Sequence, residues 1–109
     1  MAEYFYHAES GKKLRKLREL KPDLFQAFRD FDEKVFAEGA LSTRVKELIA
    51  VATAHITQCP YCIDAHTKRA KKAGASDEEV AEAIFVAMAL RAGGSFAHSA
   101  VAMEALEEK

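Results

Sequence analysis

The sequence predicts an all-α fold, a single-domain bundle of five to six helices that forms an oligomer. Alanine occupies 21 of 109 positions, whereas glycine and proline number 5 and 2, and Val, Ile and Thr together supply only 14. This composition is typical of helices packed through small side chains. Apolar residues also recur at three- and four-residue spacing along most of the chain. A mass of 12.1 kDa suits one modest core, so residues 1–109 are expected to form one domain.

The N-terminal region is predicted to be the least regular part. Residues 1–21 are interpreted as an arm with a weak, basic helix over residues 9–19, and His7 is interpreted as part of the arm or of a subunit contact. The second helix is expected to begin at Pro22 and to end at Gly39. Its apolar residues have helical spacing and are expected in the core: Leu24, Phe25, Phe28, Phe31, Val35 and Phe36.

The third helix is predicted to follow an N-cap at Ser42 and to continue to Thr57. No formally charged residue occurs from Leu48 to Thr57, so this helix is expected in the middle of the fold. Glu47 would project among apolar residues, opposite the expected core stripe. That stripe comprises Val45, Leu48, Ile49, Ala52 and Ile56.

The fourth helix is predicted from Pro60 to Ala73, where Gly74 provides a C-terminal stop. Ser76 and Glu79 have the three-residue spacing of a capping box, which marks the start of the next helix.

The fifth helix is predicted over Asp77–Arg91, and Gly93-Gly94 is expected to break it before a last helix capped by Ser95. Residues 83–90 of the fifth helix form an uninterrupted apolar run. A helix that is apolar on every side must be covered. We therefore expect a homo-oligomer built on this helix and the last one.

The balance of charged residues does not indicate a binding partner. Sixteen basic and seventeen acidic residues give a formal net charge of −1, which offers no general attraction to nucleic acid or anionic lipid. The N-terminal residues lack a secretory signal pattern, and no apolar run has the length of a membrane span. The expectation is a soluble, cytoplasmic protein without a nucleic-acid or membrane partner.

Four residues form a pattern with chemical meaning. Cys59 and Cys62 are three residues apart at a helix start, where free N–H groups and the helix dipole favour a thiolate. His66 follows Cys62 by four residues, so the two side chains share a helix face. A base beside a thiol is the arrangement that activates a nucleophile.

Glu47 can be placed near this pair by counting residues. It lies about ten residues, or ~15 Å, before the end of its helix, and His66 lies about six residues, or ~9 Å, into the next. If the helices form a hairpin, the axial gap is ~6 Å. Glu47 would then reach His66 directly or through one water and hold its positive charge.

Other readings of these residues are possible. Cys59, Cys62 and His66 could bind zinc with Glu47 or water, which would make the chain a non-catalytic metal-binding module. The dithiol could also serve only in thiol–disulfide exchange. Tyr61 would shape the pocket or donate a hydrogen bond. Two further histidines are expected to be hydrogen-bonded core or interface residues, His55 and His98.

From Leu41 to Leu106 the chain resembles the alkylhydroperoxidase AhpD-like branch of the carboxymuconolactone decarboxylase family. The motif is a Glu, a Cys-x-x-Cys twelve residues later and a His four residues after the second Cys, matched by Glu47, Cys59, Cys62 and His66. Where archetypal members have a second His before the second Cys, this chain has Tyr61.

The resemblance implies an all-α fold, trimers or hexamers, and reduction of hydroperoxides through a dithiol/disulfide cycle without a metal or other cofactor. The hypothesis that follows is that Cys62 attacks the peroxide, Cys59 resolves the sulfenic acid as a disulfide, and His66 with Glu47 relays the proton. An external dithiol or thioredoxin-like partner would restore both thiols.

Overall fold

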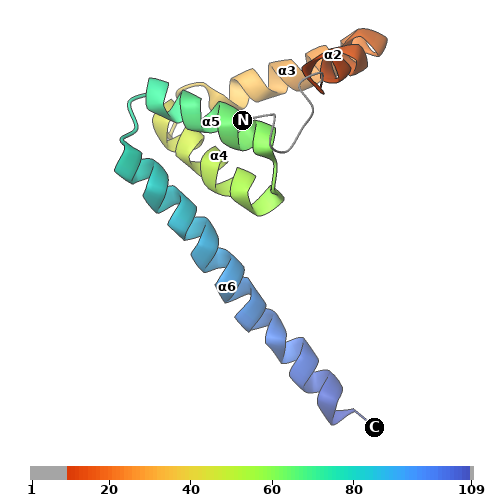
Figure 1. Ribbon diagram of the computed structural model, residues 1–109, viewed down its shortest axis with the longest axis vertical. Helices are drawn as coiled ribbons and strands as arrows, with labels where there is room; N and C mark the ends of the chain where they lie inside the picture. The colour runs from red at the N-terminus through yellow and green to blue at the C-terminus, as the bar shows by residue number, and fades with distance from the viewer. Residues whose placement is uncertain (1–9, 109) are drawn as a thin grey trace.

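The structure is a computed structural model that describes residues 10–108. In this range the chain forms helices and turns without any strand, which confirms the predicted all-α class. Residues 1–9, which are the first part of the expected arm and include His7, lie outside the described residues. The helices follow one another as α2 (Ser10–Leu20), α3 (Pro22–Phe36), α4 (Thr43–Thr57), α5 (Pro60–Lys72) and α6 (Asp77–Glu107) (Figure 1).

Helix α4 occupies the middle of the fold, as its uncharged segment predicted. It packs against α3, α5 and α6, and α4 and α5 form an antiparallel hairpin (Figure 1). Val51 of α4 and Ala70 of α5 are fully buried where these helices meet α6. The buried core is small and consists largely of alanine: Val51, Ala54, Ala70, Ala75 and Ala87.

The turn from α4 to α5 sets the position of the first cysteine. Gln58 has a left-handed backbone with φ 58° and ψ 51°, and its N–H donates to the Ala54 carbonyl. The N–H of Cys59 donates to the same carbonyl over 3.1 Å. Pro60 then begins α5, and Cys59 is its N-cap. The chain therefore reverses within two residues and holds Cys59 at a helix N-terminus.

The predicted helix caps are confirmed at two places. The Ser42 side chain accepts a hydrogen bond from the Val45 N–H at the start of α4. At the start of α6, Ser76 and Glu79 form the reciprocal capping box, with distances of 2.9 and 3.0 Å. Gly74 precedes this box with a φ of 99°, a conformation that glycine adopts readily.

Helix α6 does not break where the sequence predicted. It continues through Gly93 and Gly94 to Glu107 as one helix of 31 residues, so the separate last helix capped by Ser95 was wrong. Each glycine costs a helix only about 1 kcal/mol relative to alanine. Neither has a positive φ, and alanine-rich segments on both sides favour continuation.

Much of the apolar surface lies outside the core of a single chain. The expected core position of the α3 residues was wrong, since none of them is fully buried and Phe31 is 67% exposed. Ile49 of the predicted α4 stripe is 50% exposed. The buried face of α4 is instead Glu47, Val51 and Ala54, because α5 and α6 pack there. The distal half of α6 extends away from the other helices (Figure 1).

The radius of gyration and the accessible surface both exceed those of a compact domain. The radius of gyration is 18.1 Å, whereas a compact domain of this length has about 13 Å. The accessible surface is 8588 Å², against roughly 6,000 Å² for a compact monomer of this mass. The difference corresponds to surface that a compact monomer would bury.

Helix α6 is also long and apolar enough to cross a membrane when judged by length and composition, with a mean hydropathy of 1.4 over its most apolar window. It is the one helix in residues 10–108 that meets this test. Only 11% of the window is buried within the chain, so most of this apolar helix surface is exposed in the single chain.

Candidate functional site

The core of the site is a hydrogen bond between Glu47 and His66 that joins the two helices of the α4–α5 hairpin. Glu47 Oε1 lies 2.6 Å from His66 Nδ1, and their side chains are 5% and 15% exposed. The contact predicted by counting residues is therefore confirmed. Glu47 is the buried charged residue among those described, and His66 is the partner that compensates its burial.

Phe36 packs against the face of the His66 imidazole ring. Its ring stacks on the His66 ring with 5.1 Å between centroids and an angle of 22° between planes. With Nδ1 bonded to Glu47, the second ring nitrogen, Nε2, has no partner among residues 10–108. Phe36 was predicted only as a core residue, since no spacing rule connects α3 to a residue thirty positions later. The ring is thus fixed with one nitrogen available for proton transfer.

The two cysteines have different surroundings. Both are free thiols. The N–H of Cys62 donates to Cys59 Sγ over 3.2 Å, so the sulfur that receives the helix N-terminal N–H is that of Cys59. Burial, followed by the hydrogen bond and the charge of Cys59, raises the pKa of Cys62 to about 11.

This pKa corrects one expectation from the sequence. The helix N-terminus was expected to favour a thiolate at Cys62, but burial and the neighbouring Cys59 raise the pKa of this thiol. Very little Cys62 is therefore ionised in the resting protein near pH 7. Any reaction at this sulfur near neutral pH therefore needs a base that removes the proton, and His66 is one helical turn away.

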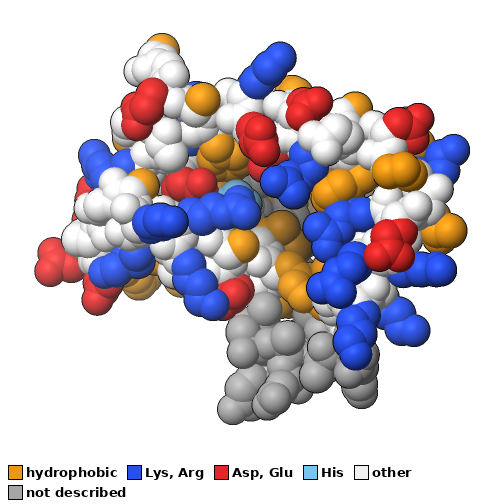
Figure 2. Space-filling view, turned by 90° about the horizontal axis from the view of Figure 1, so that it is seen from above, with side chains coloured by type: hydrophobic (Ala, Val, Ile, Leu, Met, Phe, Trp, Pro, Cys, Tyr) orange, Lys and Arg blue, Asp and Glu red, His pale blue; other side chains and the backbone are white. Residues whose placement is uncertain are grey.

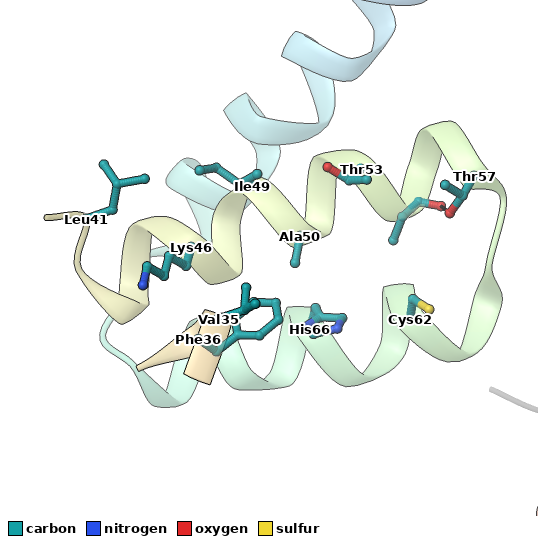
Figure 3. Close-up of a pocket in the computed structure, with 11 residues that line it drawn as sticks. Val35, Phe36, Leu41, Lys46, Ile49, Ala50, Thr53, Thr57, Cys62 and His66 are labelled. Atoms are coloured by element: carbon teal, nitrogen blue, oxygen red, sulfur yellow. Dashed lines mark hydrogen bonds between the residues drawn. The ribbon is translucent and has the colours of Figure 1, made fainter. Parts of the chain in front are cut away.

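An apolar cavity of about 450 Å³ runs beside α4 and reaches Cys62 and His66. Figure 3 shows His66 in its middle, Cys62 and Thr57 toward one end and Lys46 toward the other. Carbon dominates its wall, which is formed by Val35, Phe36, Leu41, Lys46, Ile49, Ala50, Thr53, Ala54, Thr57, Cys62 and His66. Lys46 also lines the cavity; no sequence motif predicted this, although Lys46 directly precedes Glu47.

A second, more polar cavity of about 750 Å³ reaches the same two residues from the side of α2 and α3. Arg29 and Arg69 line it, and so does Tyr61, as expected of a pocket residue. Figure 2 shows a hollow with a histidine side chain inside and basic side chains around it. Cys62 and His66 line both cavities, whereas Cys59 lines neither of these two.

Two other histidines within residues 10–108 lie apart from this site. His55 Nδ1 is 2.7 Å from the Val51 carbonyl within α4, in agreement with a hydrogen-bonded structural residue. His98 lies on the exposed distal half of α6. Within residues 10–108, no three His, Cys, Asp or Glu side chains are grouped as metal ligands would be. The zinc interpretation thus has no ligand set in the part of the chain that is described.

Two known proteins are similar to this chain in sequence. Over 82 residues the chain is 51% identical to an uncharacterized protein of the cox locus of Paracoccus denitrificans, covering 75% of this chain and 74% of the relative. It is 33% identical over 96 residues to an uncharacterized protein of Cupriavidus necator, covering 86% and 85%.

Two solved structures have a similar fold. A Methanobacterium thermoautotrophicum protein matches with a TM-score of 0.74 and 35% identity, over 78% of this chain and 96% of the other. A carboxymuconolactone decarboxylase family protein from Legionella pneumophila matches with a TM-score of 0.71 and 35% identity, over 91% and 88%. The family model for carboxymuconolactone decarboxylases matches residues 22–106. With its helices, its buried Glu47–His66 pair and these matches, the chain belongs to the carboxymuconolactone decarboxylase family.

Proposed function

We propose that the chain is an AhpD-like thiol peroxidase and disulfide oxidoreductase that reduces organic hydroperoxides in the cytoplasm without a cofactor. The observation that carries the proposal is the buried Glu47–His66 pair beside Cys62 in an apolar cavity, with a second thiol three residues away. Cys62 is the attacking sulfur because it lines the cavity with His66. Cys59, at the helix N-terminus, resolves the product.

The chemistry follows from these positions. His66 Nε2 takes the Cys62 proton as the sulfur attacks the terminal peroxide oxygen, and the O–O bond breaks. The same proton passes to the departing alkoxide, which leaves as an alcohol while Cys62 becomes a sulfenic acid. Cys59 then attacks the Cys62 sulfur. An S–S bond forms and the sulfenic oxygen leaves as water with the Cys59 proton.

Glu47 supports this proton transfer through His66. Its carboxylate accepts the Nδ1–H and compensates the positive charge that the ring gains. An external dithiol or a thioredoxin-like protein then reduces the disulfide by thiol–disulfide exchange. One cycle therefore converts a hydroperoxide and a dithiol into an alcohol, water and a disulfide.

Thiol titration tests the proposal on the full chain. One equivalent of cumene hydroperoxide should remove two free thiols per chain and release one equivalent of alcohol, because both cysteines enter the disulfide. Loss of thiols only with a disulfide donor would instead show an exchange protein that lacks peroxidase activity. No loss with either reagent would contradict both redox functions.

We also propose that copies of this chain cover the distal half of α6 in a homo-oligomer, a trimer or hexamer. The surface excess of roughly 2,600 Å² over a compact monomer is what each chain gives up in a large obligate interface. Apolar side chains extend along this half of α6: Leu90, Phe96, Val101, Met103 and Leu106. Arg91 of α6 donates to the Ile56 carbonyl of α4, and its permanent charge within the helix disfavours a lipid environment.

Light scattering without detergent tests this assembly. At micromolar concentration the wild type should have the mass of three or six chains, and Phe96→Glu should lower it because a charge would be buried in an apolar interface. Phe96→Leu keeps the surface apolar and should keep the mass. A monomeric wild type, or partition of the wild type into lipid vesicles, would contradict the proposal.

A further inference from the structure

Lys46 places a cation at one end of the apolar cavity. It lines the cavity near the start of α4, whereas Cys62 and Thr57 lie toward the opposite end (Figure 3). Lys46 is the lining residue with a permanent positive charge; the other ionisable groups in the wall are His66 and Cys62. A ligand in this cavity therefore contacts apolar side chains along most of the cavity and a positive charge at one end.

The Lys46 ammonium group has no negative partner in the described part of the chain. Its Nζ donates to the Ala37 carbonyl over 2.6 Å, which uses one of its three donors and holds the side chain in place. No Asp or Glu oxygen of residues 10–108 lies within 4.0 Å of it. The neighbouring Glu47 is bonded to His66. The cavity wall therefore has an uncompensated positive charge.

From this arrangement we infer that the cavity binds amphipathic carboxylates, with the carboxylate at Lys46 and the alkyl chain directed toward Cys62. The inference rests on the proposed function for its reactive end, where it names carboxylate-bearing alkyl hydroperoxides as the substrate class. Cys62 lies about one turn from the level of His66 and Glu47, so the two ends are one to two helical turns apart, ~6–11 Å. A medium-length alkyl chain spans that distance.

The test uses binding, so that it does not depend on turnover. Octanoate and octan-1-ol are titrated calorimetrically into the reduced full-length chain without peroxide. Octanoate should bind about tenfold more tightly, because the Lys46 ammonium group at the end of the apolar cavity pairs with its carboxylate. Lys46→Met should remove this preference and leave octanol binding unchanged, whereas Lys46→Arg should retain it.

Each outcome decides the inference. Equal affinities in the wild type, no binding of either ligand, or a preference that survives Lys46→Met would overturn it. Unchanged octanol binding by Lys46→Met shows that the cavity remains intact, and so separates a charge effect from misfolding. If octanoate is preferred but no hydroperoxide is reduced, the carboxylate site stands and the peroxidase function fails.

Discussion

Cys62→Ser is expected to abolish hydroperoxide reduction, with a fall in turnover of at least about 10³-fold. A serine hydroxyl has nearly the size of the thiol but does not attack a peroxide oxygen. The substitution also leaves the Glu47–His66 pair in place, so the loss reports on the sulfur itself. Turnover is measured as alcohol formed from cumene hydroperoxide with dithiothreitol as the reductant.

Cys59→Ser provides the matched variant, because it removes the other thiol and leaves Cys62 beside His66. It should reduce one equivalent of hydroperoxide and then stop when no external thiol is present. Its Cys62 should carry one added oxygen by mass spectrometry and react with dimedone, since no resolving sulfur is available. If Cys62→Ser shows this single turnover and Cys59→Ser does not, the roles of the two cysteines are reversed.

The Glu47–His66 contact could be predicted from the sequence because it depends on local rules. Two capped helices joined by a two-residue turn have calculable lengths, and a hairpin brings residues at similar distances from the turn to the same level. The signals at Ser42 and Pro60 marked both helix starts and are present in the structure. The position of Glu47 relative to His66 therefore depends on two helix lengths and one turn, and not on packing between distant segments.

The surfaces that remain uncovered could not be predicted in this way. Periodic apolar residues such as Phe31 indicate a face that needs a cover, but the pattern is the same whether the cover is the same chain or another copy. The Gly93-Gly94 pair was interpreted as a break because glycine weakens helices, yet its cost is small against the surrounding helix-forming residues. Phe36 and Lys46 belong to the site because of tertiary contacts, which no sequence motif predicts.

Glu47→Gln is expected to lower turnover about 10²-fold or more, while the fold is retained. Glutamine has the same length, and its carbonyl oxygen can still accept the His66 Nδ1–H, so the ring keeps its orientation. What disappears is the negative charge that compensates the ring when it takes the Cys62 proton. The loss should appear in kcat and leave the KM for the hydroperoxide nearly unchanged, because Glu47 is bonded to His66 on the side of the ring away from the free nitrogen.

A matched control separates this charge effect from a general effect of removing an acidic residue. Glu82→Gln makes the same change at an exposed position of α6 and should leave turnover unchanged. Cys62 has a raised pKa of about 11, so below that pH its thiolate fraction rises tenfold with each pH unit. The deficit of Glu47→Gln should therefore shrink at alkaline pH, where Cys62 ionises without help from His66. A deficit that is constant from pH 7 to 10 would contradict proton transfer through the Glu47–His66 pair and leave Glu47 only a structural role.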